Sequence, residues 1–273
     1  MSDFRVARGV SERPVARIGR EGAEVDAVVV EEPLEIRVAG DPVAVTMRTP
    51  GHDERLALGF LFGEGIVRGA EDVGSIAHCG RVGEEGFGNV IDVLPAPGVA
   101  LAPERSKRGT VTTSACGVCG RLTIADLLAR VAPIDDDTRV DPARAVALVG
   151  ALTEAQPLFA RTGGIHAAAV FDVETGERLA SFEDVGRHNA VDKTIGELLV
   201  AKRVPARGTA LVVSGRISFE IVQKALVARI PILLGVSAAS SLAIDLATKS
   251  SLGLAGFVRG TSMNVYATES RFR

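Results

Sequence analysis

The sequence predicts a two-part α/β protein, with a smaller strand-rich domain over residues 1–109 and a larger α/β domain over residues 110–273. Three observations lead to this prediction. Runs rich in β-branched residues dominate the first part of the chain, whereas strand and helix patterns alternate in the second part. A length of 273 residues is also long for one compact domain and short for three.

Short apolar runs between turn residues define the expected N-terminal strands. These runs cover residues 24–30, 34–38, 43–48, 75–79 and 89–94. Asp53 is a suitable helix cap, and apolar residues recur after it, so a helix is expected from Asp53 to about Gly63. The loop 95–109 combines prolines, glycines and charges, which makes it the expected domain boundary.

The second part of the chain alternates two kinds of pattern. Helices are expected at residues 122–131, 142–155, 189–201, 219–228 and 240–249. Strands are expected at residues 166–170, 179–182, 210–213, 232–235, 254–258 and 265–266. Short glycine-containing links between them imply right-handed crossovers and a three-layer α/β/α sandwich. Ligands of such sheets bind beyond the carboxyl ends of the strands.

Composition excludes several classes of protein. The formal net charge of -3 argues against a dedicated nucleic-acid binder, and 47% hydrophobic residues are enough for a real core. No apolar run is long enough to span a bilayer, and residues 1–20 do not read as a signal peptide. With only three cysteines, we expect a cytoplasmic protein without a structural disulfide.

Five polar, glycine-rich segments lie at the ends of expected elements in the second part. They are residues 114–120, 162–166, 183–189, 214–218 and 257–262. Two of these segments lead into expected helices and carry Arg187 and Arg216, so they suit a phosphorylated ligand. Helix caps and turns would explain each segment taken singly, but that explanation is weaker for all five together.

Cys116 and Cys119 form a C-x-x-C between glycines, and three chemistries fit this spacing. A zinc site needs about four ligands, and the candidates to complete it are Cys79, His78, His166 and His188. The signature of a zinc deaminase fails twice, because His166 is followed by two alanines and Cys116 is preceded by another.

The other two chemistries are redox cycling and sulfur transfer. Redox cycling fits the position of the motif, but nothing else in the sequence supports it. Sulfur transfer needs an exposed, mobile thiolate near positive charge, and Lys107, Arg108 and Arg121 lie close in sequence. We expect Cys79 to be a small buried hydrophobic residue.

Taken together, the segments 114–120, 162–166, 183–193, 214–216 and 257–260 resemble the FdhD family of sulfur carrier proteins, which formate dehydrogenase activity requires. The resemblance covers residues 37–266, nearly the whole chain. The longest motif, residues 183–193, is highly specific, whereas a lone C-x-x-C would be weak.

The resemblance implies a sulfurtransferase that works as a persulfide relay. A cysteine desulfurase loads Cys116, with Cys119 as its partner. The sulfur then passes to the molybdenum or tungsten bis(molybdopterin guanine dinucleotide) cofactor before this enters the formate dehydrogenase catalytic subunit. The resemblance also implies a homodimer, no structural metal, and a C-terminal domain similar in fold to cytidine deaminase. The implied cofactor-binding stretch is Phe257, Val258, Arg259, Gly260, Thr261 and Ser262.

Within that frame, Arg187, Arg216 and Arg259 suit the phosphates of the cofactor by charge and geometry. Asp184 or Asp192 is expected to pair with a guanine edge. For His166 and His188, proton transfer and a purely structural role stay open. The role of Cys119 and the choice between molybdenum and tungsten also stay open. Two rival functions are a non-catalytic chaperone for the cofactor and a zinc-dependent deaminase.

Overall fold

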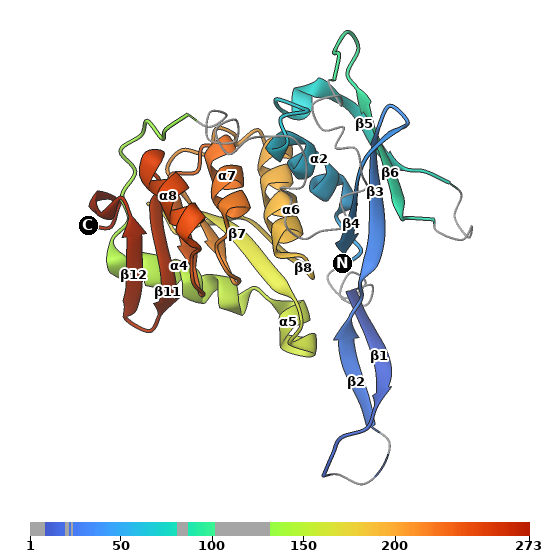
Figure 1. Cartoon of the computed structure of the whole chain (residues 1–273), viewed down its shortest axis with the longest axis horizontal. Helices are drawn as coiled ribbons and strands as arrows, with labels where there is room; N and C mark the ends of the chain where they lie inside the picture. The colour runs from blue at the N-terminus through green and yellow to red at the C-terminus, as the bar shows by residue number, and fades with distance from the viewer. Residues whose placement is uncertain (1–8, 20–21, 23, 81–86, 102–131) are drawn as a thin grey trace.

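The computed structural model describes residues 9–19, 22, 24–80, 87–101 and 132–273 (Figure 1). These residues form a six-stranded sheet, a four-stranded sheet and a two-stranded ribbon. The expected domain boundary at residues 109 and 110, and the helix expected at residues 122–131, lie outside the described residues.

The six-stranded sheet has the order β12-β11-β10-β9-β7-β8. Its strands are β7 (His166–Asp172), β8 (Arg178–Asp184), β9 (Thr209–Val213), β10 (Ile232–Gly235), β11 (Gly253–Arg259) and β12 (Ser262–Ala267). Strands β9, β10 and β11 are parallel, while β7 runs antiparallel to both β8 and β9. The carboxyl ends of β8, β9, β10 and β11 therefore meet the beginning of β7 at one edge of the sheet.

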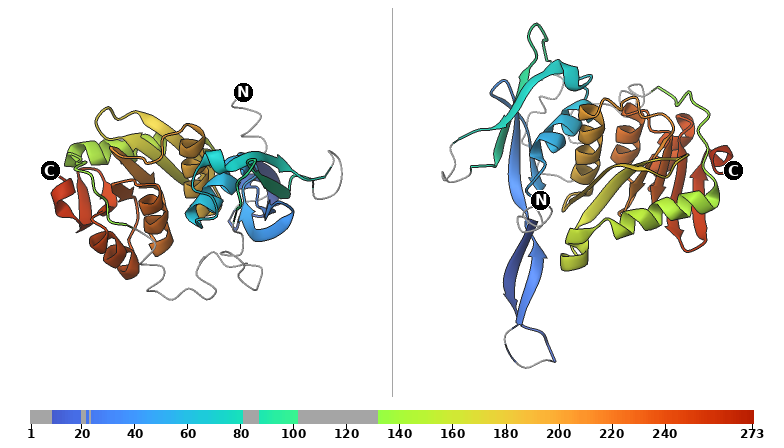
Figure 2. Two further views of the ribbon diagram at one scale, coloured as in Figure 1. Left: turned by 90° about the horizontal axis from the view of Figure 1, so that it is seen from above. Right: turned by 180° about the vertical axis from the view of Figure 1, so that it is seen from behind.

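Helices cover both faces of this sheet (Figures 1 and 2). One face carries α6 (Arg187–Val200), α7 (Phe219–Val227) and α8 (Ser241–Lys249), and the other carries α4 (Pro142–Glu154). Successive residues of β7 point to opposite faces, so Ala168 and Val170 belong to one core and Ala169 and Phe171 to the other. This confirms the predicted three-layer sandwich; its similarity to cytidine deaminase stays a prediction.

The N-terminal part is rich in strands, as predicted. Its sheet has the order β4-β3-β6-β5, formed by β3 (Glu32–Val38), β4 (Asp41–Arg48), β5 (Val73–His78) and β6 (Val90–Pro95). Helix α2 (Asp53–Gly63) packs against this sheet, with the short 3-10 turn Ala70–Asp72 beside it. Leu34, Ile36 and Ile91 point inward and are fully buried, while Glu35 and Arg37 pair on the outer face.

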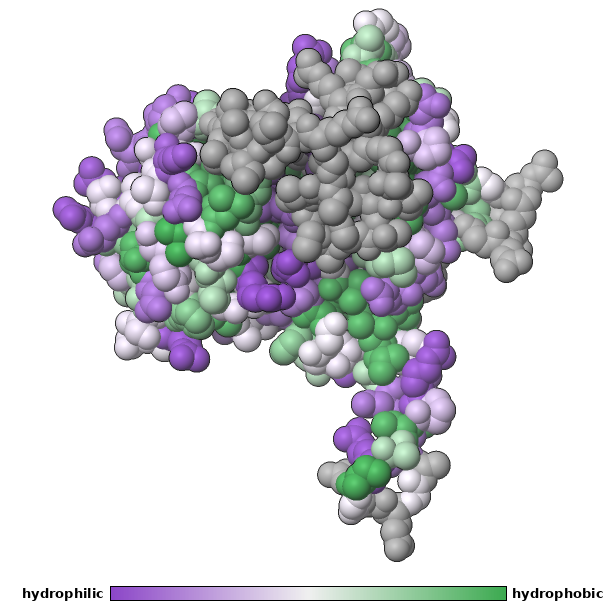
Figure 3. Space-filling model, in the orientation of Figure 1, coloured by the Kyte–Doolittle hydropathy of each residue, from purple (hydrophilic) through white to green (hydrophobic). Residues whose placement is uncertain are grey.

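A β-ribbon of β1 (Val10–Val15) and β2 (Glu24–Val29) projects from the body (Figure 1). Its surface mixes hydrophobic and hydrophilic side chains (Figure 3). The sequence did not predict β1, because its central residues Ser11–Pro14 lack apolar alternation. It also missed the short helix α5 (Pro157–Thr162) and the 3-10 turn Glu269–Arg271.

Helices α2 and α6 cross at two glycines, one from each part of the chain. A Cβ on Gly59 would lie 1.9 Å from the carbonyl oxygen of Asp192, and one on Gly196 would lie 2.0 Å from that of Arg55. Only glycine permits so close a backbone approach. Buried residues of both parts consequently belong to one continuous hydrophobic core. In the described part of the chain, no helix is long and apolar enough to cross a membrane.

Candidate functional site

The sheet topology gathers four of the five glycine-rich segments at one edge. Residues 162–166 precede β7, residues 183–189 follow β8, residues 214–218 follow β9, and residues 257–262 end β11 and form its turn into β12. This arrangement confirms that these loops meet at the carboxyl edge of the sheet. The fifth segment, with Cys116 and Cys119, lies outside the described residues.

His166, Arg187 and Arg216 form the centre of this edge. Gly215 brings them close, because a Cβ there would lie 3.1 Å from His166 Nδ1 and 3.8 Å from Arg187 Cβ. Burial, and then the charges of Arg187 and Arg216, lower the pKa of His166 from its ordinary value of 6.5. The site therefore combines a neutral imidazole with two guanidinium groups, a donor set that suits an anion.

One buried nitrogen of this site, the Nε of Arg187, lacks a hydrogen-bond partner among the described residues. Buried polar atoms in native proteins are nearly always paired, so an unpaired one requires a reason. A bound anion would supply the missing acceptor. We call His166, Arg187 and Arg216 the anion site.

His188 lies beside the anion site and ties α6 to α7. Its Nε2 lies 2.9 Å from Glu220 Oε2 and 3.0 Å from Ser218 Oγ. Ser218 is the N-cap residue of α7, yet its hydroxyl serves His188 and caps no backbone N–H in the described residues. No pattern in the sequence singles out Glu220, because a glutamate in a first helical turn is common.

The stretch 257–262 lies at the same edge but further along the sheet. One strand separates β9 from β11, so these two strands are about 10 Å apart. Phe257 has a left-handed φ of 52° and donates its N–H to the Ser237 carbonyl. Val258 is buried in the core, whereas Arg259 and Gly260 are exposed. Thr261 and Ser262 help line a shallow hollow of about 530 Å³.

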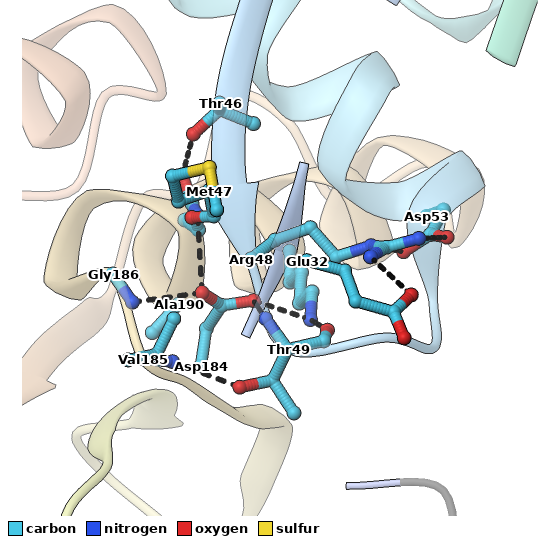
Figure 4. A network of polar contacts seen from close by, with 12 residues as sticks. Glu32, Thr46, Met47, Arg48, Thr49, Asp53, Asp184, Val185, Gly186 and Ala190 are labelled. Carbon is cyan, nitrogen blue, oxygen red and sulfur yellow. Dashed lines mark hydrogen bonds and ion pairs between the residues drawn. The ribbon is translucent and has the colours of Figure 1, made fainter. Parts of the chain in front are cut away.

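The buried side of residues 183–193 faces the N-terminal part of the chain (Figure 4). The Asp184 carboxylate pairs with Lys193 Nζ at 2.6 Å and accepts the N–H groups of Thr49 and Gly186. Lys193 also donates to the Thr49 carbonyl at 2.9 Å. Asn189 donates to the Met47 carbonyl and to Asp184. We call Thr49, Asp184, Asn189 and Lys193 the interior network.

Glu183 holds a different element. Its carboxylate accepts the N–H groups of Leu158 and Phe159, at the beginning of α5. Burial raises the pKa of Glu183, against the opposing effect of these two hydrogen bonds. Since α5 leads directly into residues 163–166, Glu183 positions the loop that precedes His166.

The expectation for Asp184 and Asp192 at a guanine edge is wrong. Asp184 is 0% exposed and Asp192 only 2%, and both have internal partners. Asp192 pairs with Lys224 Nζ at 2.6 Å, where burial raises the pKa of the Asp192 carboxyl against the attraction of Lys224. Sequence cannot distinguish such a carboxylate from a ligand-binding one, because its burial depends on partners that are far away in the chain.

The histidines do not form a metal centre in the part of the chain that the structure describes. No group of three or more His, Cys, Asp or Glu side chains there is placed to hold a metal ion. His78 instead lies 3.4 Å from the Asp53 carboxylate, and Cys79 is half-buried at the end of β5.

Comparison with known sequences gives the family. The sequence profile of the FdhD/NarQ family matches residues 29–273. This chain belongs to the FdhD/NarQ family. The matched residues include the whole sheet edge and the interior network, while most of the β1–β2 ribbon precedes the matched residues.

Individual FdhD/NarQ relatives match over nearly their full length. The sulfur carrier protein FdhD of Anaeromyxobacter dehalogenans strain 2CP-1 is 54% identical over 97% of this chain and 94% of its own. The protein of that name from Mycobacterium tuberculosis is 49% identical over 90% of this chain and 91% of its own. A crystal structure from Desulfotalea psychrophila, described as a formate dehydrogenase accessory protein, superposes with a TM-score of 0.74. It is 25% identical and covers 97% of this chain and 98% of its own.

Proposed function

We propose that this chain is a sulfur carrier that matures formate dehydrogenase. In this proposal it accepts a persulfide sulfur from a cysteine desulfurase on Cys116. It then passes the sulfur to the molybdenum bis(molybdopterin guanine dinucleotide) cofactor, which it holds as a bound substrate. Family membership supports the carrier role, since relatives at about half identity bear that name.

The anion site is the observation that carries the cofactor-binding part of the proposal. The cofactor is rich in phosphate, and phosphate oxygens would accept hydrogen bonds from Arg187 and Arg216. The buried, unpartnered Nε of Arg187 fits such an acceptor. Arg259 and the turn after β11 would reach a more distant part of so large a ligand, together with Phe257.

The proposed chemistry at Cys116 is a thiol–persulfide exchange. The Cys116 thiolate attacks the outer sulfur of the desulfurase persulfide, and a new S–S bond forms. The S–S bond of the donor breaks, and its cysteine leaves as a thiolate. The sulfane sulfur then travels with Cys116 as a persulfide, which makes the chain a sulfurtransferase. Cys119 has three possible roles. It attacks the inner sulfur on Cys116, so that a Cys116–Cys119 disulfide forms and the outer sulfur leaves as sulfide; or it assists transfer without a covalent step; or it only shapes the loop.

The proposal includes three further elements. The chain works in the cytoplasm, it forms a homodimer, and the catalytic subunit of formate dehydrogenase receives the sulfurated cofactor. Sedimentation equilibrium of the purified protein tests the second element: a monomer at micromolar concentration would remove it.

A mass measurement tests the carrier role. The protein is incubated with a cysteine desulfurase and cysteine, and the Cys116 peptide is expected to gain about 32 Da, one sulfur atom. The Cys116→Ala variant is expected to abolish sulfur transfer, and Cys119→Ala to weaken it less. Equal loss in both variants would contradict the ranking, and an unlabelled Cys116 peptide would exclude the relay.

The two rival functions give different results. A chaperone that only holds the cofactor would let Cys116→Ala bind cofactor and restore formate dehydrogenase fully. A zinc-dependent deaminase would contain stoichiometric zinc that is lost when Cys116 and Cys119 are replaced. We expect neither result.

A further inference from the structure

Thr49 joins the two parts of the chain at the point where α6 begins. It lies just after β4, is 2% exposed, and uses all of its polar groups on one short segment. Its N–H donates to Asp184 Oδ2 at 3.2 Å, its carbonyl accepts from Lys193 at 2.9 Å, and its Oγ1 accepts the Val185 N–H at 3.1 Å. Figure 4 shows Thr49 beside Asp184, with a dashed line from its side-chain oxygen toward Val185.

The contact with Val185 fixes the backbone that leads to the anion site. Val185 N–H is held by Thr49, and the next N–H, of Gly186, is held by Asp184 at 2.8 Å. Arg187 follows at once as the first residue of α6. Two consecutive backbone donors are thus oriented by the interior network immediately before the anion site.

Arg187 depends on this backbone for its placement. Its buried Nε has no hydrogen-bond partner in the described ranges, so that atom does not anchor the side chain. A Cβ on Gly215 would lie 3.1 Å from His166 Nδ1, so the His166 ring packs closely on this backbone, with Arg187 Cβ next to it. A small shift of residues 184–187 would therefore change the separation of the Arg187 charge from His166.

We propose that Thr49 is a positioning residue for the anion site, acting through the Val185 backbone on Arg187. The N-terminal part of the chain thereby sets the geometry of a site whose ligand-facing residues all belong to the C-terminal part. The ligand class, an anion such as a nucleoside diphosphate, rests on the proposed function; the placement of Arg187 against His166 does not.

Thr49→Val tests this role, because valine keeps the shape of threonine and removes the acceptor for Val185. Titration of His166 by NMR is the first readout. In the native protein Arg187 helps to lower the pKa of His166, so we expect that pKa to rise toward its ordinary value in the variant. Calorimetry with GDP is the second readout, with affinity expected to fall about five- to tenfold, the effect of one hydrogen bond.

Two control variants separate positioning from general stability. Thr49→Ser keeps the hydroxyl and is expected to restore both readouts. Thr46→Val removes another hydrogen bond of the same interface, from Thr46 Oγ1 to Asn189 Oδ1 at 3.1 Å, and is expected to leave the titration of His166 unchanged. If Thr49→Val does not fold, Thr49→Ala takes its place, with the same expected direction.

The results distinguish the positioning role of Thr49 from the proposed function. A native titration of His166 in the Thr49→Val protein, or an equal change in Thr46→Val, would overturn the positioning role. Failure of the native protein to bind GDP would instead count against the proposed function, while the titration would still test Thr49.

Discussion

The interior network and the anion site lie within a few residues of each other, yet they differ in how their charged groups are paired. Asp184 and Lys193 are paired and closed to solvent, with backbone groups of Thr49 completing their hydrogen bonds. Arg187, between them in sequence, has a buried Nε without a partner in the described structure. Satisfied polar groups hold a fold together, whereas the unpaired Arg187 Nε is a donor that a bound anion would satisfy.

This comparison changes the meaning of the longest motif. Most polar residues of 183–193 are architectural. Glu183 positions α5, Asn189 binds Met47 in β4, and Asp184 and Lys193 bind Thr49 just after β4. Arg187 instead belongs to the anion site, and His188 lies beside it. Substitutions in the interior network should therefore lower stability, and substitutions in the anion site should lower ligand affinity.

The largest effect is expected from Lys193→Met, which leaves the Asp184 carboxylate buried without its cation. Unfolding by urea should show a loss of about 3–5 kcal/mol. Adding Asp184→Asn should recover part of this loss, because the uncompensated charge is then gone. Arg55→Ala, which breaks the half-exposed pair of Arg55 with Glu197, should cost less than about 1 kcal/mol. Equal losses in Lys193→Met and Arg55→Ala would refute the structural role of the network.

A second stability effect concerns the helix crossing. Gly196→Ala would place Cβ 2.0 Å from the Arg55 carbonyl and should destabilise the protein by about 1–3 kcal/mol. Gly150→Ala is the matched control: Gly150 lies in α4, and beyond its chain neighbours and the nearby helix backbone no described atom lies within 4 Å of the new Cβ. This change should stabilise the protein by about 0.5–1 kcal/mol. Thermal denaturation of both variants is expected to give shifts of opposite sign.

Substitutions in the anion site should lower ligand affinity rather than stability. Arg187→Ala and Arg216→Ala are each expected to lower GDP affinity about tenfold by calorimetry, since a charge-assisted hydrogen bond is lost. Arg259→Ala should have a smaller effect, and unchanged affinity would remove Arg259 from the site. Arg178→Ala, at the far end of β8, serves as the control. If Arg187→Ala or Arg216→Ala lowered stability as much as Lys193→Met, the distinction between the anion site and the interior network would be wrong.

The smallest effect is a pH dependence. Burial and the charges of Arg187 and Arg216 hold the folded pKa of His166 below its ordinary value of 6.5. The unfolded chain therefore binds the proton more tightly, and the stability contributed by neutral His166 is lost as pH falls below about 6.5. A bound anion favours the protonated imidazole, so GDP should bind more tightly at lower pH with proton uptake. Calorimetry in two buffers of different ionisation enthalpy measures that uptake, and His166→Asn should abolish it.

Much of the fold could be predicted because its signals are local. Apolar runs and their spacing predicted β7 through β11 and α6 through α8, and glycine-rich loops predicted where their ends meet. The elements that were missed, β1 and α5, lack such signals. Strand β1 is polar at its centre, and α5 is too short for a helical pattern.

The candidate site was predicted in part. Arg187 and Arg216 stand beside helix beginnings in sequence, and the structure brings them together around His166. The roles of Thr49 and Glu220 were beyond sequence reasoning, since each depends on a partner from another element. The same limit led to the wrong expectation for Asp184 and Asp192.

The sequence by itself determined the order of elements, the α/β class, the segments at the sheet edge and the family resemblance. All of these depend on residues close together in the chain. Only the tertiary structure decided which charges of residues 183–193 are buried and which are available to a ligand. The reason is physical: Asp184 is neutralised by Lys193 and completed by Thr49, which lies 135 residues away in sequence. Burial is a property of that packing and not of the motif.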